Sequence, residues 1–418
     1  MAELSRVLDD TIRQERGRII AGLLRLCKSL DAAEDALHEA VLAAMQAWRA
    51  QVPNNPGAWL MTAAKNSAQD ALRHRAVAES NATVLEMGVQ NQETIDSVSD
   101  DYLRLIFACC HPALSKDNQI ALTLKVVAGF STEEIARAFV CSDDTVSQRV
   151  LRAKRVLADL NVPYSLPTRG ELEERVAAVL GVIYAMFNEG HTARSGPLMR
   201  LDLQVEAFRL GRLVTDLLPR EPEAFGLIAL MAFSAARARA RVAGDGVPIL
   251  LASQDRSQWD RELIHEGLMA LQYARTFQGR SHYVLQAELA AVHVTAVSWE
   301  HTDWAAIVTL YDALSKIAPS PIVMLNRAVA VSMLEGPRAG LAALIPLERP
   351  LAQYHYFHAT RADLLERAGQ DGRAAWKQAI ALATNDGERL LLQSRLAQAR
   401  SRQGPAAPQA IPSRGRRR

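Results

Sequence analysis

The chain has 418 residues, which is too long for one ordinary domain and leads us to expect two to four. Hydrophobic residues make up 49% and charged residues 22%, a balance that supplies hydrophobic cores and excludes a largely disordered chain. The net charge is only +2, so any affinity for nucleic acid has to come from local basic patches rather than from the whole molecule.

The beginning of the chain, MAELSRVLDDTIRQE, is acidic and amphipathic and therefore differs from a signal peptide. No stretch of about 18 uninterrupted apolar residues occurs, so we expect no membrane-spanning helix and a cytoplasmic location. The cysteines are spaced neither as a zinc site nor as the disulfide framework of a small secreted domain. We predict reduced, buried thiols at all four positions, Cys27, Cys109, Cys110 and Cys141.

Apolar residues recur at helical spacing through most of the chain, and clusters of strand-forming residues are sparse, which predicts an all-α fold. One segment interrupts the pattern with six carboxylates and no Lys or Arg, which is the composition of a linker. The predicted parts are a helical domain at 1–78, the acidic linker at 79–101, a second helical domain at 102–162, a helical extension at 163–285, helical repeats at 286–402 and a basic disordered tail at 403–418.

The helix predicted for residues 31–48, DAAEDALHEAVLAAMQAW, combines an apolar stripe with an acidic remainder. A surface of acidic and apolar side chains suits binding to a basic protein partner. A solvated acidic face explains the same pattern, so periodicity leaves both interpretations open. The predicted stripe consists of Ala36, Leu37, Ala40, Val41, Ala44, Met45 and Trp48.

A further helix is predicted for residues 55–75, NPGAWLMTAAKNSAQDALRHR, because Pro56 stands near its start. Trp59 is expected to pack inward. Single-stranded bases are held by stacking surfaces, cations and amide side chains that contact base edges. The residues of this helix that could supply such contacts are Lys65, Asn66, Arg73 and Arg75.

Residues 129–157, GFSTEEIARAFVCSDDTVSQRVLRAKRVL, predict a helix-turn-helix. Ser131 and Glu134 form a capping box for the first helix, and Ser142 can cap the second. The second helix directs Val146, Val150 and Leu157 toward a core and a basic face outward, which suits a DNA major groove. A hairpin with a solvated basic face is the alternative. The outward face comprises Thr145, Gln148, Arg149 and Arg152, with Lys154 and Arg155 nearby.

These three segments together resemble the sigma-70 family of bacterial RNA polymerase sigma factors, in its extracytoplasmic-function group. Residues 31–48 resemble sigma region 2.2, and residues 55–75 resemble regions 2.3 and 2.4. Val140 departs from the pattern, because many such turns carry Gly there, and this favours a different turn geometry. The helix-turn-helix resembles region 4 through Ser131, Glu133, Glu134, Ile135, Ala136, Thr145, Val146, Arg149, Arg152, Ala153 and Lys154.

The resemblance implies a nucleoid-associated, non-enzymatic protein without cofactor or metal, which binds the β′ clamp and β flap of RNA polymerase core and melts promoter DNA. An anti-sigma or other regulatory protein is a further candidate partner. The acidic linker either mimics RNA near the RNA path or is a plain tether. The implied −35 contacts are Thr145, Gln148, Arg149, Arg152, Lys154 and Arg155. The implied −10 contacts are Lys65, Asn66, Asp70, Arg73 and Arg75. The implied contacts to core polymerase are Glu34, Asp35, Leu37, Glu39 and Leu42.

The extension needs a separate role, because ordinary members of this group end near Leu160. Arg327 and Ala328 recur as Arg361 and Ala362, a period of 34, and each unit consists of a helix, a turn with Gly and a second helix. This predicts tetratricopeptide-like repeats, and the whole layout resembles sigma factors that carry such an extension. Repeat surfaces bind peptides and proteins, so we expect the extension to regulate the sigma domains by docking.

Two clusters of polar residues in the extension could indicate chemistry. A helix is expected to end at residues 188–190 in a polar loop, for which a cap with hydrogen bonds is the simpler explanation. His355 and His358 stand at i, i+3 spacing without a second acidic or His pair, which argues against a metal site. The candidate cluster of the loop is Asn188, Glu189, His191 and Arg194.

Two other functions stay open on the sequence alone. A DNA-binding regulator with a helical sensor domain would use the helix-turn-helix but leave residues 31–75 unexplained. An enzyme within residues 170–400 has only the polar loop after the helix in its favour, because no Gly-rich phosphate loop or nucleophile elbow is present.

Overall fold

The computed structural model is helical throughout the described part of the chain, apart from one isolated bridge between Val242 and Pro248, which confirms the all-α prediction. The chain divides into two compact units, and the boundary falls within helix α10 (Pro222–Ala235). The first unit comprises residues 1–193 and 199–231, and the second comprises 194–198 and 232–418. The residues that the structure describes are 2–49, 51–78, 95–139, 141–160, 162, 168, 171–191, 201–243, 247–277 and 281–402.

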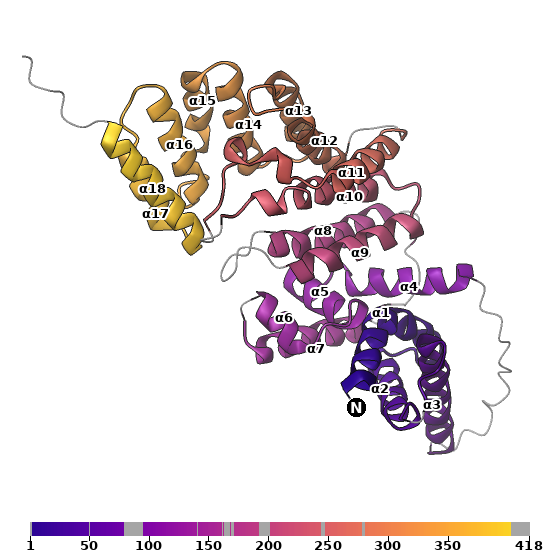
Figure 1. Ribbon diagram of the computed structural model, residues 1–418. Helices are drawn as coiled ribbons and strands as arrows, with labels where there is room; N and C mark the ends of the chain where they lie inside the picture. Colours follow the sequence, from indigo (N-terminus) through magenta and orange to yellow (C-terminus); the bar gives the residue numbers. More distant parts are fainter. Residues whose placement is uncertain are drawn as a thin grey trace, which may run out of the picture. The chain divides into compact units, whose positions relative to one another are not determined.

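The first unit begins with three long helices that pack on one another through buried aliphatic residues such as Ile20, Leu37 and Leu60 (Figure 1). The apolar residues recur every three to four positions, so each helix presents one stripe to this shared core. The helices of the unit are α1 (Ala2–Cys27), α2 (Leu30–Ala47), α3 (Pro56–Ala78), α4 (Ile95–Cys109), α5 (Lys116–Leu122) with the π-helical turn η1 (Thr123–Val127), α6 (Thr132–Phe139), α7 (Asp143–Asp159), α8 (Leu172–His191), α9 (Leu201–Leu217) and the first part of α10.

Helix α4 begins at Ile95, inside the segment predicted to be a linker, so residues 95–101 correct that prediction. Asp101 shows the physical reason, because its side chain is buried and forms ion pairs with Arg25 at 3.3 Å and with Arg104 at 3.2 Å. A buried carboxylate is tolerated when it is paired in this way. The end of the acidic segment therefore belongs to the folded unit, whereas residues 79–94 lie outside the described residues.

The cysteines are all free, as predicted, but only Cys109 and Cys110 are buried. Cys27 and Cys141 are half-buried, which corrects the prediction of four buried thiols. Burial raises the pKa of Cys109 well above its usual value and that of Cys110 to about 11. Both buried side chains are therefore protonated thiols at neutral pH and act as small core residues.

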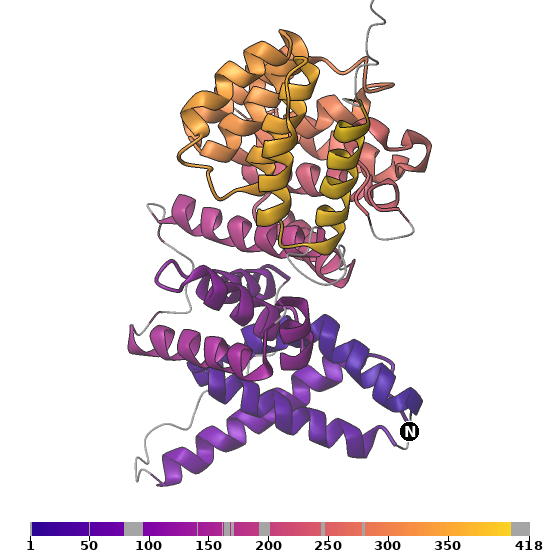
Figure 2. The ribbon, with the colours of Figure 1, turned by 90° about the vertical axis from the view of Figure 1, so that its left-hand side faces the viewer.

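In the second unit, each helix from α11 onward packs against the next one along the chain (Figures 1 and 2). Such sequential packing is the arrangement expected of a repeat domain, while membership in the tetratricopeptide class stays a prediction. The elements are the end of α10, the 3-10 turns η2 (Ala238–Ala240), η3 (Leu251–Ser253) and η4 (Arg256–Gln258), α11 (Arg261–Ala274), α12 (His282–Thr295), α13 (Trp304–Ile317), α14 (Pro321–Leu334), α15 (Pro337–Leu344), the 3-10 turn η5 (Ile345–Leu347), α16 (His355–Arg367), α17 (Arg373–Leu382) and α18 (Asp386–Arg402).

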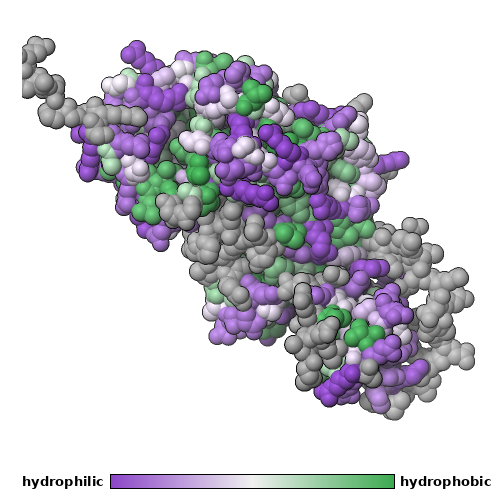
Figure 3. Space-filling model, in the orientation of Figure 1, coloured by the Kyte–Doolittle hydropathy of each residue, from purple (hydrophilic) through white to green (hydrophobic). Residues whose placement is uncertain are grey.

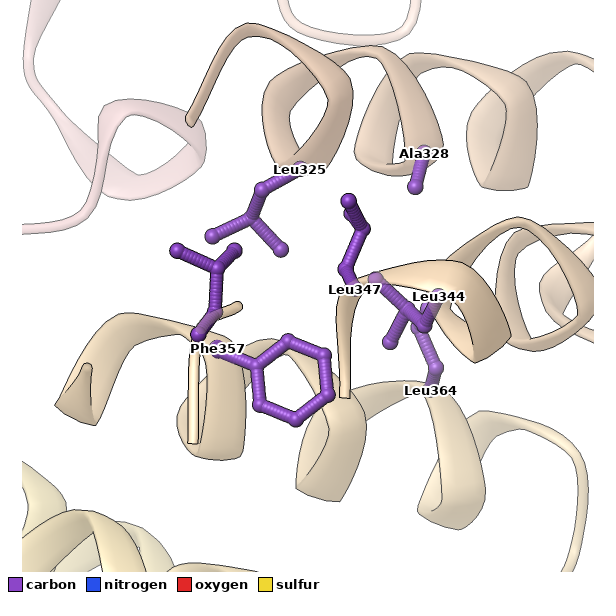
Figure 4. Close-up of a cluster of buried hydrophobic side chains, with 7 residues drawn as sticks. Leu325, Ala328, Leu344, Leu347, Phe357 and Leu364 are labelled. Carbon is purple, nitrogen blue, oxygen red and sulfur yellow. The ribbon is translucent and has the colours of Figure 1, made fainter. Parts of the chain in front are cut away.

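One core cluster of the second unit joins α14 to α16. Leu325 and Ala328 on α14 point toward Phe357 and Leu364 on α16, and Leu347 lies between the two helices (Figure 4). All of these side chains are buried. The two helices thus share one apolar seam, in the way that neighbouring units of a helical array bury their faces.

Small residues let neighbouring helices approach closely in this part of the chain. Ala328 and Ala362, which are 34 positions apart, are both fully buried. A Cβ atom on Gly340 would lie 2.5 Å from Cβ of Ser332, and one on Gly372 would lie 2.6 Å from the carbonyl oxygen of Ala362. The glycines therefore stand where a neighbouring helix leaves no room for a side chain.

The face of the molecule shown in Figure 3 is mostly hydrophilic, with hydrophobic residues gathered in small, separate patches. Such scattered patches are ordinary for a folded domain that buries its apolar stripes. Within the described residues, none of the helices combines the length and the apolarity that crossing a membrane requires.

Candidate nucleic-acid and protein interface

Helices α6 and α7 form the predicted helix-turn-helix, and their caps are confirmed. The backbone amide of Glu134 donates to the Ser131 hydroxyl at 3.1 Å, and the amide of Ser131 donates to the Glu134 carboxylate at 2.7 Å. The amide of Thr145 donates to the hydroxyl of Ser142 at 3.2 Å, which starts α7. Val140 of the connecting turn lies outside the described residues.

Helix α7 has one buried side and one exposed, cationic side. Val146 and Leu157 are buried against the rest of the domain, as the periodicity predicted. The exposed side carries Gln148, Arg152 and Arg155, which leave a guanidinium-rich surface facing solvent. Such a surface can contact phosphates and base edges in a major groove.

Three other residues of the predicted DNA surface are engaged within the protein. The Arg149 guanidinium donates to the Asp117 carboxylate at 2.7 Å, and the Thr145 hydroxyl lies 2.9 Å from that of Ser142. Lys154 is only 18% exposed and turns toward α2. Lys154 therefore lies at the border between the exposed face of α7 and its buried side.

Lys154 joins α7 to α2 through two carboxylates. Its Nζ lies 2.6 Å from Asp31 and also bonds to Glu34. Glu34 in turn accepts from Nη2 of Arg16 at 2.5 Å, while Nε of Arg16 donates to the carbonyl of Lys125 at 3.1 Å. Figures 1 and 2 both place α7 beside these first helices. The predicted DNA-binding and polymerase-binding helices are thus bonded to each other.

The charge balance of this contact favours its ionised form. Burial lowers the pKa of Lys154, but the hydrogen bonds and charges of Asp31 and Glu34 outweigh burial and leave that pKa above its usual value. Lys125, without such direct carboxylate bonds, has its pKa lowered by burial and by the neighbouring Arg16. Lys154 is therefore fully charged at neutral pH and holds the contact electrostatically.

The outer surface of α2 carries part of the predicted partner-binding set. Asp35, Glu39 and Leu42 are exposed, and Met45, which the sequence assigned to the core stripe, is 48% exposed. Leu37 is 1% exposed and belongs to the core, so it cannot contact a partner directly. The apolar stripe predicted from the sequence was too wide, because α1 and α3 cover only its centre.

A hollow of about 110 Å³ lies between α2 and α3 beside these acidic residues. Asp35 and Glu39 line it from α2, and Ala68 and Leu72 line it from α3. It is large enough for an aliphatic side chain of a partner, with carboxylates placed to meet a neighbouring cation. The spacing of residues within either helix could not predict this hollow, because it forms between two helices.

Helix α3 presents polar residues on its second half. Asn66, Asp70 and Arg73 are exposed, with Arg73 donating to Asp70 at 3.3 Å, and Lys65 is half-buried. The side chain of Arg75 lies outside the described residues. Near the other end of α3, Trp59 is half-buried and packs edge-on against Trp48 at 5.5 Å between ring centres, in line with the expected inward packing.

The start of the extension packs against α4. Nη2 of Arg175 on α8 donates to the carbonyl of Phe107 at 3.0 Å. Arg209 on α9 pairs with Glu206 at 2.7 Å and also interacts with Tyr102 on α4, whose pKa burial raises. Helices α8 and α9 are thereby fixed to the domain that contains the helix-turn-helix.

The polar cluster predicted after the first helix of the extension is arranged differently. Helix α8 continues to His191, so Asn188, Glu189 and His191 stand on its last turns and not in a loop. The side chains of Glu189 and His191, and the whole of Arg194, lie outside the described residues. Among the residues that are described, His, Cys, Asp and Glu do not gather in any group of three or more suited to a metal ion.

The two histidines of α16 are engaged separately. His355 lies 3.3 Å from the Glu388 carboxylate on α18. His358 forms a 2.8 Å hydrogen bond with the carbonyl of Ala352. Their bonds point to different partners, so these residues serve the packing of the helices.

Comparison with protein families gives three matches along the chain. Residues 11–77 match the model of Sigma-70 region 2, and residues 104–157 match that of Sigma-70, region 4. Residues 175–275 match a family of unknown function (DUF6596). The first two matches cover α1–α3 and α4–α7, where the geometry places the exposed acidic and basic faces.

Two relatives extend these matches. An uncharacterized protein of Rhizobium meliloti (strain 1021) is 40% identical over 405 residues, which cover 93% of this chain and 95% of that protein. The RNA polymerase sigma factor CarQ of Myxococcus xanthus is 30% identical over 173 residues, which cover 40% of this chain and 92% of that protein. No solved structure matches the chain.

Proposed function

Because this chain belongs to the sigma-70 family of RNA polymerase sigma factors, in an extracytoplasmic-function-like form with a DUF6596 domain after region 4, we propose specific contacts to polymerase and promoter and a regulatory role for the extension. As a sigma factor it is not an enzyme and directs transcription initiation by binding RNA polymerase core and promoter DNA.

The −35 element is bound first by the exposed face of α7. Gln148, Arg152 and Arg155 are free to reach base edges and phosphates. Arg149 and Lys154 join them only when they leave their carboxylate partners. Thr145 contributes at the helix start, where its hydroxyl already bonds to the capping Ser142.

The −10 element and the core polymerase are bound by the other sigma domain. The single-stranded −10 region is met by α3, through exposed Asn66, Asp70 and Arg73 together with Lys65 and Arg75. The β′ clamp is met by the outer face of α2, where acidic residues flank exposed apolar ones. The α2 contacts are Glu34, Asp35, Glu39, Leu42 and Met45.

The free protein is held closed by the contact between α7 and α2. Lys154 and Glu34 are bonded to each other. In this state Glu34 is not available to bind polymerase, and Lys154 is not available to bind DNA. The two uses exclude each other, so polymerase and promoter have to separate the helices. Binding of either partner then makes binding of the other easier, because one opening step serves both.

The extension regulates this opening through its attachment to α4. The observation that carries this proposal is the hydrogen bond from Arg175 on α8 to the carbonyl of Phe107 on α4. A ligand or partner that shifts α8 would shift the domain carrying α7 as well. The regulatory signal therefore has a physical route from the extension to the promoter-binding helix.

Initiation by core polymerase reconstituted with the full chain tests the proposal. Arg175→Ala removes the bond to α4 and is expected to change the amount of transcript at least several-fold, while Arg220→Ala, an exposed control in the same unit, leaves it unchanged. If both variants initiate like the natural protein, and the chain truncated after residue 161 does so as well, the extension does not regulate the sigma domains.

A further inference from the structure

A cluster of basic and aromatic side chains lies in the second unit and includes none of the residues assigned to polymerase or promoter. It combines Arg237 at the start of η2, Arg256 at the start of η4, Trp259 and His293 near the end of α12. The segments are tied together by the amide of Asp260, which donates to the carbonyl of Ala236 at 2.9 Å. The cluster is therefore assembled from residues of several separate segments of the chain.

Arg256 is the structural centre of the cluster. Its Nη1 donates to the carbonyls of His293 at 2.9 Å and of Ala296 at 2.7 Å, which satisfies the end of α12. Its guanidinium carbon lies 4.4 Å from the centre of the Trp259 ring. One edge of this guanidinium is thus fixed by the protein, and the remaining nitrogens have a defined direction.

Several polar atoms around that centre lack hydrogen-bond partners. Nε of Arg237, Nη2 of Arg256, Nε1 of Trp259 and Nδ1 of His293 are buried without a hydrogen-bond partner. Within the described residues, neither Arg237 nor Arg256 forms an ion pair with a carboxylate. Arg237 and Arg256 are half-buried, and each has a buried nitrogen without an acceptor, which costs free energy.

The positive charge of the cluster shifts the pKa values of its members. Burial and the nearby Arg241 and Arg256 lower the pKa of Arg237 to about 10. Burial and the two guanidinium groups of Arg237 and Arg256 lower the pKa of His293 to about 4, so this ring is neutral at physiological pH. An anion placed among these groups would offset the repulsion between the two guanidinium groups and accept hydrogen bonds from the unpaired Nε of Arg237 and Nη2 of Arg256.

A purely structural role explains only part of the arrangement. It accounts for Nη1 of Arg256, which caps α12, and for the stacking of the His293 ring on Trp299 at 6.3 Å between centres. It does not account for Arg237, whose guanidinium is partly buried among like charges and makes no ion pair within the described residues. Proteins usually place carboxylates, phosphates or paired side chains beside such a group.

We propose that Arg237, Arg256 and Trp259 form a binding site for an oxyanion, a phosphate or carboxylate group of a small-molecule ligand, in the extension of this sigma factor. The guanidinium groups and the indole N–H donate to the anion, and the aromatic rings around His293 shield it from water. The extension thereby gains a chemical input, a small anionic metabolite, that is independent of the contacts to polymerase and promoter.

Thermal melting of the full chain in sodium phosphate or sodium citrate, against sodium chloride of equal ionic strength, tests the proposal. Phosphate or citrate at saturation is expected to raise the melting temperature by about 5 °C over chloride, because a ligand that binds only the folded state stabilises it. A response to phosphate alone identifies a phosphate site, and a response to both identifies a general oxyanion site. No response to either anion overturns the proposal.

Variants on a single turn separate this site from general salt effects. Arg237→Gln is expected to abolish the shift, and Arg237→Lys to weaken the apparent affinity about tenfold, because a point charge replaces the two-pronged donor. Arg239→Gln, which removes an exposed cation from the same turn, keeps the full shift. The site is excluded if Arg237→Lys and Arg239→Gln respond alike; this comparison holds even if Arg237→Gln does not fold.

Discussion

Replacing Lys154 by methionine is expected to weaken the contact between α7 and α2 by about 1–2 kcal/mol. Lys154 and Glu34 are 18% and 19% exposed, so their pair is screened less than surface pairs, which contribute about 0.2–1 kcal/mol. Asp31, at 72% exposed, adds little. The cost of desolvating Lys154 offsets part of the attraction between the two charges, so the contact contributes no more than about 2 kcal/mol. A loss of this size opens the contact about 5- to 30-fold more often.

Binding to core RNA polymerase, measured by fluorescence anisotropy of the labelled chain, reports this opening. In the closed state Glu34 is bonded to Lys154, so only open molecules can bind core polymerase and the apparent affinity is reduced in proportion to their fraction. Lys154→Met is therefore expected to bind core about 5- to 30-fold more tightly. Arg155→Met is the matched control, because it removes an exposed cation from the same helix and leaves the contact intact. Equal core affinities for the natural protein and both variants would refute the closed state.

Three other outcomes follow from particular side chains. In the unfolded chain His293 takes up a proton near pH 6.5, whereas its pKa in the folded protein is about 4. The free energy of unfolding, measured by urea titration, should therefore fall by up to about 3 kcal/mol as the pH is lowered from 6.5 to 4, and by less in His293→Gln. Gly340→Ala should cost about 1–3 kcal/mol in the same assay, because its Cβ would lie 2.5 Å from Cβ of Ser332. Leu37→Ala should lose about 2–5 kcal/mol of stability, whereas Leu42→Ala should keep its stability and bind core polymerase more weakly.

Local features of the fold could be predicted from the sequence, because their causes lie within a few residues. The capping box of Ser131 with Glu134 and the cap at Ser142 use side chains and amides three positions apart, and both form as expected. The buried side of α7 follows from helical spacing alone, which placed Val146 and Leu157 correctly. Such predictions need no knowledge of what the helix packs against.

Features that depend on neighbouring helices could not be predicted from the sequence. Spacing on α2 grouped Leu37 with Met45, and only the positions of α1 and α3 decide that the first is core and the second surface. Gly190 suggested the end of α8, yet the helix continues to His191, because glycine also adopts helical backbone angles. The acidic composition of residues 95–101 likewise concealed a helix that buries Asp101 against Arg25.

The pairing of Lys154 with Glu34 is the clearest case of information that no local pattern contains, since the two residues are 120 positions apart. It also divides the cations of α7 into two groups. Arg152 and Arg155 are exposed, so we expect them to provide the long-range attraction that brings DNA to the helix, whereas Arg149 and Lys154 are already paired with carboxylates. In the proposed promoter complex, full contact therefore exchanges protein carboxylates for DNA phosphates. Because we propose that this exchange also releases α2, we expect contacts with both polymerase and DNA to offset the loss of the internal ion pairs, so that neither partner has to supply that free energy alone.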